Sequence, residues 1–433
     1  MYNLKIEAKK IIQELQDKGF EAYFVGNYPF VKQHNILNAE NKLKIKTIDI
    51  VTNARLEDVQ SLFKVTKINE EYNKSVFVEI PVKQNFLQFR IYHAGEYINI
   101  VNKKTKQVDT VDDILYNFGF LIDTLRIDND GKIINYVNKK YSAIDSISSR
   151  SLQANGNFRE KLIENPMIIF ELCLYASNIS YNINESNLKI ITNNRDYLKH
   201  VPLSLIVKYF NKILMSKNPI VGLQIIKDCL LDFEYKNNKI FEFLKFCSNE
   251  CLLQLSQFNS SIDIISRWAY LLNSVPEEIR LNTLTNLELS YKNKVLWILE
   301  NYNIVNDEDN YKMAIYDSKE SLKKIHETRY DIFLLYEMFD KLTKLHQILN
   351  EDKTDVCKKI MDTICSRPFF TYQIAYSDDD ICKIANIEKG KWLDLTKEHL
   401  IKKIILENKH PNEDQYMNLL KESIEYGLIS CQL

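Results

Sequence analysis

The spacing of hydrophobic residues changes along the chain, from a mixture of helix and strand periods to a helix period alone. Residues 4–17 carry apolar side chains every three or four positions, which predicts an amphipathic helix that ends at Gly19. Short apolar runs at 22–25 and 47–51 predict strands, and residues 56–63 predict a second helix. The first part of the chain is therefore expected to mix helices with strands.

Further strands and turns are expected before the helix period takes over. Residues 76–91 read as two strands interrupted near Pro81, and residues 128–131 have the composition of a hairpin turn. From residue 200 onward the apolar positions keep a helix period, with one helix starting at Pro219. This pattern predicts an all-helical second part.

A row of aromatic residues lies within residues 318–350, which read as a long amphipathic helix or a pair of helices. The row recurs at helix spacing and consists of Tyr330, Phe333, Tyr336 and Phe339. Aromatic side chains at this spacing more often form a helix's buried face than a platform for nucleobases, so we expect core positions. A base-stacking surface is the alternative.

Composition supports this picture and limits the possible partners. A chain of 433 residues exceeds one ordinary domain, and its low content of 9 glycines and 8 prolines favours a mostly helical protein. Lysine and arginine total 57 against 58 acidic residues, a net charge of −1. Because this balance gives no global positive field, any contact with RNA must use local patches.

Cysteine usage and hydropathy point to the cytoplasm. The 8 cysteines include no Cys-x-x-Cys pair with matching ligands, so we expect reduced thiols rather than a zinc site. The first residues lack the charged and apolar segments of a signal peptide, and no apolar run reaches membrane-spanning length. We therefore expect a cytoplasmic protein that does not contact membranes.

Two predicted strands near the start carry the residues with the most chemical interest. The first is Phe24-Val25-Gly26, which ends in a turn, and the second points Thr47 and Asp49 to one face. The order of four segments, FVG, TIDIVTNA, DNDGKIIN and ENPM, resembles the class II tRNA nucleotidyltransferases. This family comprises CCA-adding enzymes and bacterial poly(A) polymerases.

The resemblance covers nearly the whole chain and implies an α+β fold. A mixed-sheet nucleotidyltransferase head, like that of DNA polymerase β, would be followed by an extended all-α neck, body and tail. The implied boundaries are 1–140 for the head, 141–200 for a neck with the nucleobase site, 201–317 for the body and 318–433 for the tail.

The catalytic motifs of the family are incomplete in this chain. In the family, a Gly-Gly turn approaches the triphosphate, and two aspartates on one strand face hold two Mg²⁺ ions. Here Asn27 follows Gly26, and Thr47 replaces the first aspartate, which leaves Asp49 as the implied catalytic residue and metal ligand. Because the paired metal carboxylates are reduced to Asp49, we expect little or no catalysis.

The implied nucleotide contacts come from the head and from the neck. They are Gly26, Asn27, Glu164 and Asn165. The family arginine that reads the incoming base is replaced by Ile168, which has no hydrogen-bonding group for a base edge. Two other polar positions also differ, with Asp123 in place of an asparagine and Glu171 in place of an arginine.

The last part of the chain resembles the family's tail, which contacts tRNA. The implied phosphate contacts are Lys389, Lys391, Lys402 and Lys403. An ordinary solvated lysine face is the alternative.

Three functional hypotheses remain open. The first is a catalytically impaired relative that binds tRNA or another structured RNA, without binding DNA. The second is an active CCA- or A-adding enzyme that uses Mg²⁺ and a nucleoside triphosphate, with Asp49 joined by a relocated carboxylate, Glu79 or Glu96. The third is a helical scaffold that binds a protein partner. Without activity, no cofactor is expected.

Overall fold

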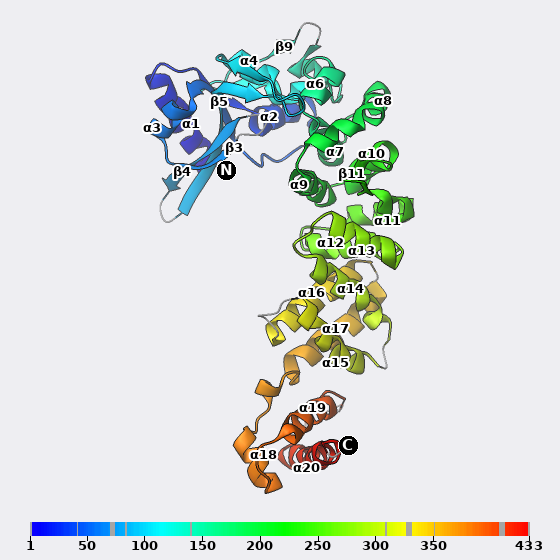
Figure 1. Cartoon of the computed structure of the whole chain (residues 1–433). Coiled ribbons are helices and arrows are strands. Elements are labelled where there is room, and N and C mark those ends of the chain that lie inside the picture. Colours follow the sequence, from blue (N-terminus) through cyan, green and yellow to red (C-terminus); the bar gives the residue numbers. More distant parts are fainter. Residues whose placement is uncertain are drawn as a thin grey trace. The chain divides into compact units, whose positions relative to one another are not determined.

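The computed structural model of the chain is shown in Figure 1. It describes residues 2–40, 42–69, 74–82, 85–138, 141–307, 310–325, 331–349, 351–406 and 412–431. The chain divides into two compact units, Met1–Lys245 and Phe246–Leu433. The finer division into head, neck, body and tail stays a prediction.

The first unit is built on a mixed sheet whose strands run in the order β3-β4-β5-β2-β1-β7-β8, with β6 paired to β5. The β2–β5 pair is parallel, and the other pairs in this sheet are antiparallel. The strands are β1 (Ala22–Val25), β2 (Asp49–Arg55), β3 (Val65–Asn69), β4 (Ser75–Val82), β5 (Asn85–Ile98), β6 (Thr105–Val108), β7 (Arg126–Ile127) and β8 (Ile133–Ile134).

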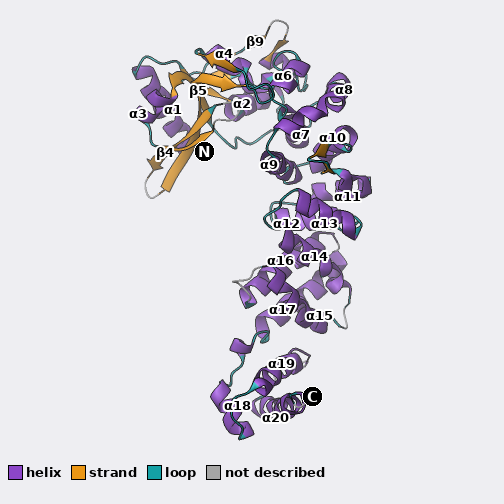
Figure 2. Cartoon of the chain, viewed as in Figure 1, coloured by secondary structure: helices purple, strands orange, loops and turns teal. Residues whose placement is uncertain are grey.

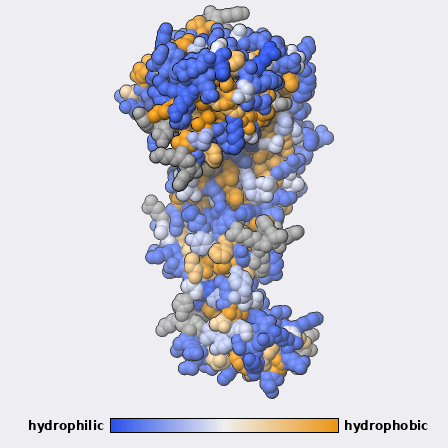
Figure 3. Space-filling model, turned by 90° about the vertical axis from the view of Figure 1, so that its left-hand side faces the viewer, coloured by the Kyte–Doolittle hydropathy of each residue, from blue (hydrophilic) through white to orange (hydrophobic). Residues whose placement is uncertain are grey.

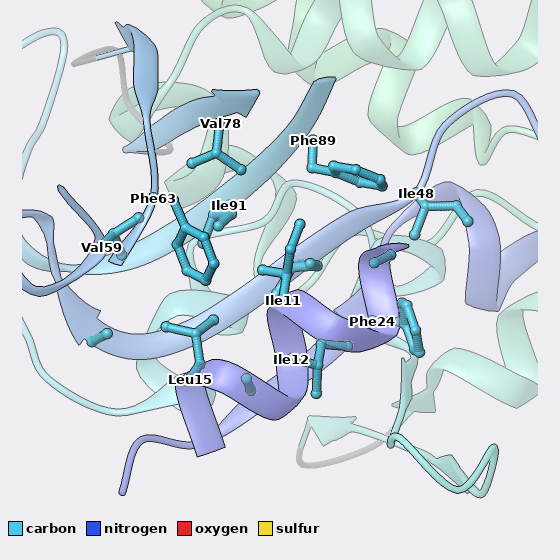
Figure 4. Close-up of a cluster of buried hydrophobic side chains, with 14 of the residues drawn as sticks. Ile11, Ile12, Leu15, Phe24, Ile48, Val59, Phe63, Val78, Phe89 and Ile91 are labelled. Carbon is cyan, nitrogen blue, oxygen red and sulfur yellow. The ribbon is translucent and has the colours of Figure 1, made fainter. Parts of the chain in front are cut away.

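Helix α1 (Tyr2–Asp17) covers one face of this sheet. Its apolar stripe, which includes Ile11, Ile12 and Leu15, is fully buried and packs toward Phe24 and Ile91 of the sheet (Figure 4). The chain then turns at a glycine with a φ of 87°, a value that other residues rarely adopt. The predicted first helix and its end at Gly19 are confirmed.

The second strand starts later than predicted. It begins at Asp49 and ends at Arg55, so Thr47 precedes the strand instead of lying in it. The reason is a competing interaction, because the Asn27 side-chain oxygen accepts hydrogen bonds from the N–H groups of Lys46 (2.8 Å) and Thr47 (3.3 Å). These bonds direct the segment toward α2 (Asn27–Leu37) rather than along the sheet.

The remainder of the first unit is largely helical (Figure 2). Its further α-helices are α3 (Leu56–Leu62), α4 (Val111–Tyr116), α5 (Ala143–Ser148), α6 (Phe158–Glu164), α7 (Ile168–Ile179), α8 (Glu185–Asn194), α9 (Leu203–Leu214) and α10 (Pro219–Leu230). Two short hairpins also occur, β9 (Val137–Asn138) with β10 (Tyr141–Ser142) and β11 (Glu234–Tyr235) with β12 (Asn238–Lys239). The second hairpin interrupts the region that the sequence predicted to be entirely helical.

In its described part, the second unit consists of α-helices and short 3-10 turns (Figure 2). The helices are α11 (Asn249–Gln254), α12 (Ile264–Leu272), α13 (Glu277–Asn286), α14 (Lys292–Glu300), α15 (Tyr311–Ser321), α16 (Ile332–Leu349), α17 (Thr354–Ser366), α18 (Asp378–Ala385), α19 (Lys391–Leu406) and α20 (Glu413–Ser430). A mixed-sheet head followed by helices confirms the predicted α+β fold class.

The aromatic row was predicted to be core, and this is wrong for two of its members. Phe339 is fully buried, but Phe333 is 69% exposed and Tyr336 is 44% exposed. The buried stripe of α16 instead follows aliphatic and sulfur side chains at Leu335 and Met338, which leaves the two aromatic residues on another side of the helix. Tyr330 lies outside the described residues.

Hydrophilic and hydrophobic side chains are mixed over the face shown in Figure 3. Among the described helices, none combines the length and the apolar character that crossing a bilayer requires.

Candidate functional site

A cavity of about 840 Å³ lies in the first unit, where the sheet meets α7 and α9. Its lining carries both signs of charge. The cationic lining residues are Lys42, Lys44, Lys46, Arg90, Lys212 and Lys217. The acidic lining residues are Asp49, Asp123 and Glu171. This volume is in the range of small-molecule and cofactor sites.

A glycine turn between β1 and α2 brings the acidic residues together. Gly26 has a φ of 70°, and a Cβ atom built on it would lie 3.3 Å from the Asp49 Oδ2 atom. Its N–H donates a hydrogen bond of 3.3 Å to the Asp123 carbonyl, while Val25 before it pairs with Asp49 across β1 and β2. Glycine is needed here for both its backbone angle and its missing side chain.

Asp49 lies opposite Arg90 in the parallel pairing of β2 with β5. Burial raises the pKa of Asp49, and the Arg90 guanidinium and a hydrogen bond with Thr47 oppose that rise. Arg90 in turn donates a hydrogen bond of 3.0 Å to the Tyr92 hydroxyl and lies 5.1 Å from the ring centroid of Phe77. The position across from Asp49 is therefore held by a cation.

Two further carboxyl groups stand in the same cavity. Asp123 belongs to the 3-10 helix Leu121–Thr124 and accepts a hydrogen bond from the Tyr175 hydroxyl. Burial raises the pKa of Asp123 to about 7. The negative charge of Asp49 also raises this pKa, whereas the hydrogen bond from Tyr175 lowers it. Burial also raises the pKa of Glu171 on α7 to about 7, assisted by the charge of Asp123.

Sequence reasoning did not select Asp123 and Glu171 as site residues. Both occupy positions where the family resemblance implies an uncharged or a basic residue, and that change of charge was the available signal. A Cβ atom built on Gly119 would lie 3.0 Å from the Glu171 Oε2 atom, so the head approaches α7 closely at this carboxyl. The three acidic residues come from β2, the 3-10 helix and α7, and the fold alone brings them together.

Of the predicted site residues, Gly26, Asn27, Asp49 and Asn165 line the cavity, and Glu164 does not. Glu164 is the last residue of α6, where its carboxylate lies 3.7 Å from the ammonium of Lys161 on the same helix. Glu164 therefore does not share the cavity with the other three implied nucleotide contacts, Gly26, Asn27 and Asn165.

The proposed relocated carboxylates do not reach Asp49. Glu79 on β4 lies 3.5 Å from the ammonium of Lys64, and Glu96 lines a separate cavity of about 290 Å³ in the head. Neither residue lines the cavity that contains Asp49. The sequence-based idea that one of them rebuilds the metal site therefore gains no support from this cavity.

The residues around Asp49 do not fit the two Mg²⁺ ions that the resemblance implies. Thr47 stands where one aspartate was expected and Arg90 stands across from Asp49. Within the described ranges, no three His, Cys, Asp or Glu side chains form a group that could hold a metal ion. Divalent magnesium requires several oxygen ligands with negative charge, and this cavity presents a cation instead.

The predicted RNA-binding lysines lie in the second unit, where some have acidic neighbours. Lys389 lies 2.8 Å from a carboxylate oxygen of Asp379, and Lys403 lies 3.5 Å from one of Glu422. Lys391 is exposed at the start of α19, and the Lys402 ammonium lies 6.0 Å from the ring centroid of Tyr316. Their role in RNA binding stays a prediction.

Comparison with known proteins finds relatives along most of the chain, although no family model matches it. A CCA-adding enzyme of Staphylococcus epidermidis is 21% identical over 399 residues, which cover 89% of this chain and 90% of that protein. One of Bacillus cereus is 23% identical over 278 residues, covering 63% of this chain and 64% of that protein.

Solved structures agree with these relatives. The Bacillus stearothermophilus CCA-adding enzyme in complex with CTP aligns with a TM-score of 0.71 at 15% identity, over 97% of this chain and 98% of that one. The Thermotoga maritima CCA-adding enzyme complexed with tRNA aligns with a TM-score of 0.53 at 14% identity, over 96% of this chain and 94% of that one. This likeness establishes the fold.

Proposed function

Because this chain is related to the tRNA nucleotidyltransferases, we propose that it binds a nucleoside triphosphate and tRNA, and that its nucleotidyl transfer is impaired. The observation that carries this proposal is the pairing of Asp49 with Arg90, beside Thr47. The cavity between the sheet and α7 supports binding, whereas the charge pattern around Asp49 argues against metal-assisted transfer.

The cavity supports the nucleotide part of the proposal. Its volume of about 840 Å³ suits a nucleotide, and solved relatives are complexed with CTP and with ATP. Helix α2 begins beside the cavity with Gly26 as its N-cap, and no side chain caps its first N–H groups. Backbone N–H groups at a helix start favour phosphate, and the missing Cβ lets a phosphate approach.

The acidic residues support the impairment of transfer. Two-ion phosphoryl transfer needs anionic ligands that hold both ions against the attacking and leaving oxygens. In this cavity Asp49 is opposed by Arg90, and burial raises the pKa of Asp123 and Glu171 to about 7, which reduces their negative charge at neutral pH. We expect a transfer rate lower by about 1,000-fold or more than that of an intact relative, since several kcal/mol of stabilisation are missing.

The RNA part rests on a relative, since the Thermotoga maritima enzyme is complexed with tRNA and shares the fold of this chain. The exposed lysines of the second unit, such as Lys391, supply local positive charge for such a contact. A net charge of −1 makes these local patches necessary.

Incorporation of labelled CTP and ATP into tRNA that lacks its CCA end tests the proposal. Wild type and Asp49→Ala are assayed in Mg²⁺ or Mn²⁺ beside a bacterial CCA-adding enzyme, and tRNA binding is followed on native gels. We expect a tRNA shift with little or no incorporation, equal in both variants. If the wild-type chain incorporates nucleotide at nearly the rate of the bacterial enzyme, and Asp49→Ala abolishes this incorporation, the proposed impairment is contradicted. Absence of both transfer and tRNA binding would favour a scaffold for a protein partner.

A further inference from the structure

We propose that residues 42–47 form a lysine strap that binds the triphosphate of a nucleotide without a divalent metal ion. The strap is defined by Lys42, Lys44 and Lys46 with the residues between them. This inference rests on the proposed nucleotide binding and adds its mode, in which ammonium groups take the place of Mg²⁺.

The sequence of the strap separates its polar and apolar side chains. Lys42, Lys44 and Lys46 are exposed, whereas Leu43 and Ile45 between them are half-buried. Ile45 packs against the hydrophobic core of the sheet. This alternation of exposed and half-buried positions places the three lysines on the solvent side of the segment and its two apolar residues on the other side. All three lysines line the cavity that contains Asp49.

Two asparagines of α2 hold the strap backbone in place. The Asn35 amide donates to the Leu43 carbonyl at 2.9 Å and accepts from the Leu43 N–H at 2.7 Å. The Asn27 side-chain oxygen accepts from the N–H groups of Lys46 and Thr47. Asn27 stands where the family resemblance implied a second glycine, and glycine has no side chain for these two bonds. The position of the strap therefore depends on a residue that differs from the glycine implied by the family resemblance.

The charge of the cavity favours a polyanion. Lys212 of α9 and Lys217 line the same cavity as the three strap lysines. In the described part of the chain, the ion pairs of this unit join other lysines and arginines to carboxylates, and none involves a strap lysine. The ammonium groups of Lys42, Lys44 and Lys46 thus remain available to phosphate oxygens, which lysine binds as a point charge.

Because the cavity does not suit Mg²⁺ ions, the lysines of the strap are the groups that neutralise the phosphates. A triphosphate carries several negative charges that must be neutralised on binding. The resemblance of this chain to the tRNA nucleotidyltransferases implies Mg²⁺ for this purpose. The cavity described above cannot assemble the oxygen ligands of such ions, and instead presents five lysines. Lysines then supply the compensating charge.

Equilibrium dialysis of labelled CTP and ATP against the full chain, in EDTA and in Mg²⁺, tests this inference. We expect dissociation constants in EDTA within about threefold of those in Mg²⁺, since ammonium groups already compensate the phosphates. The triple variant Lys42→Ala, Lys44→Ala and Lys46→Ala should bind about 10- to 100-fold more weakly, as expected for three contacts at exposed positions.

Matched variants separate charge from position. Replacing Lys18, Lys67 and Lys132, which are exposed in the same unit and do not line the cavity, should leave binding unchanged. The triple lysine-to-arginine variant of the strap should bind within a few-fold of wild type. Asn27→Gly should weaken binding without changing any charge, because the strap loses two hydrogen bonds. Far-UV circular dichroism confirms that each variant is folded.

Two negative outcomes differ in meaning. Binding that needs Mg²⁺, or that is unaffected by loss of the strap lysines, would overturn the metal-free strap and leave the proposed nucleotide binding intact. Absence of CTP and ATP binding to wild type in both conditions would overturn the strap together with the nucleotide part of the proposed function. Dialysis of cytidine and of inorganic tripolyphosphate shows whether the phosphates carry the affinity, and a preference for cytidine would also contradict the strap.

Discussion

Asp49 and Arg90 lie opposite each other in the register of the parallel strands β2 and β5, and both line the cavity of about 840 Å³ in the first unit. The guanidinium acts against the burial that raises the pKa of Asp49. Arg90 also donates to the Tyr92 hydroxyl and lies over the ring of Phe77. One residue thus links the electrostatics of the cavity to the packing of the sheet.

Replacing Arg90 by glutamine should therefore lower the stability of the first unit. The variant loses a charged hydrogen bond and a cation–π contact, which together correspond to about 2–4 kcal/mol of unfolding free energy. Urea unfolding followed by far-UV circular dichroism measures the loss. The three tryptophans, at 268, 297 and 392, all lie in the second unit, so their fluorescence supplies an internal reference.

Arg55→Gln is the matched control for this loss. Arg55 lies at the other end of β2, where it is 61% exposed and lies 3.3 Å from Asp109. A surface ion pair of this kind contributes about 1 kcal/mol or less. An equal destabilisation by Arg55→Gln and Arg90→Gln would show that the Arg90 contacts with Tyr92 and Phe77 contribute no more to stability than a surface ion pair.

Gly26→Ala should disturb the site more than an equivalent change elsewhere. The backbone at Gly26 has a φ of 70°, and the new Cβ atom would lie 3.3 Å from the Asp49 carboxylate. We expect about 1 kcal/mol or more of destabilisation together with weaker CTP binding. Gly19→Ala, at a φ of 87° with no atom within 4 Å of the new Cβ, should destabilise similarly and leave CTP binding unchanged. Equal CTP affinity in both variants would argue against a nucleotide at the Gly26 turn.

The local elements of this protein follow from its sequence because their causes are local. The stripe of α1, the glycine that ends it and the turn at Asp128 to Gly131 each depend on neighbouring residues, and each is confirmed. The start of strand β2 was predicted two residues too early, because Asn27, about twenty positions before it, binds the backbone at Lys46 and Thr47.

The cavity is less predictable because its parts are distant in sequence. Asp49, Asp123 and Glu171 line one cavity through the packing of a strand, a 3-10 helix and α7, and no spacing rule connects them. The opposition of Asp49 and Arg90 depends on the register of a parallel pair, which the hydrophobic pattern of either strand leaves open. Resemblance to a family supplied Gly26, Asn27, Asp49 and Asn165, which line the cavity, and also Glu164, which does not line it and whose side chain lies near Lys161.

The stability of the first unit should fall as the pH rises from 5 to 8. Burial raises the pKa of Asp123 and of Glu171 to about 7, above the ordinary values of 3.8 and 4.5. A carboxyl with a raised folded pKa contributes fully below its unfolded pKa, and this contribution is lost as the pH rises through the folded value. For these coupled groups we expect a loss of roughly 2 kcal/mol across that window.

Asp123→Asn should remove a large share of this pH dependence. Asparagine does not ionise, and its side-chain oxygen can still accept the hydrogen bond from Tyr175. Unfolding by urea at pH 5, 6, 7 and 8 compares this variant with wild type and with Asp17→Asn, an exposed position on α1. A slope for Asp123→Asn equal to that of wild type would mean that Asp123 does not titrate in this window.

Replacing the four tail lysines should weaken tRNA binding and reduce its dependence on salt. Lys389, Lys391, Lys402 and Lys403 lie in or beside α19, and acidic neighbours compensate part of the charge of Lys389 and Lys403. If two phosphates lose their contacts, the slope of log affinity against log salt should fall by about 1–2. Native-gel titrations of tRNA at several potassium chloride concentrations measure this slope. The control is the double variant Lys358→Ala and Lys359→Ala, on an exposed side of α17. An equal effect of the tail variant and the α17 variant would show that the tail lysines act through overall charge rather than a defined RNA contact.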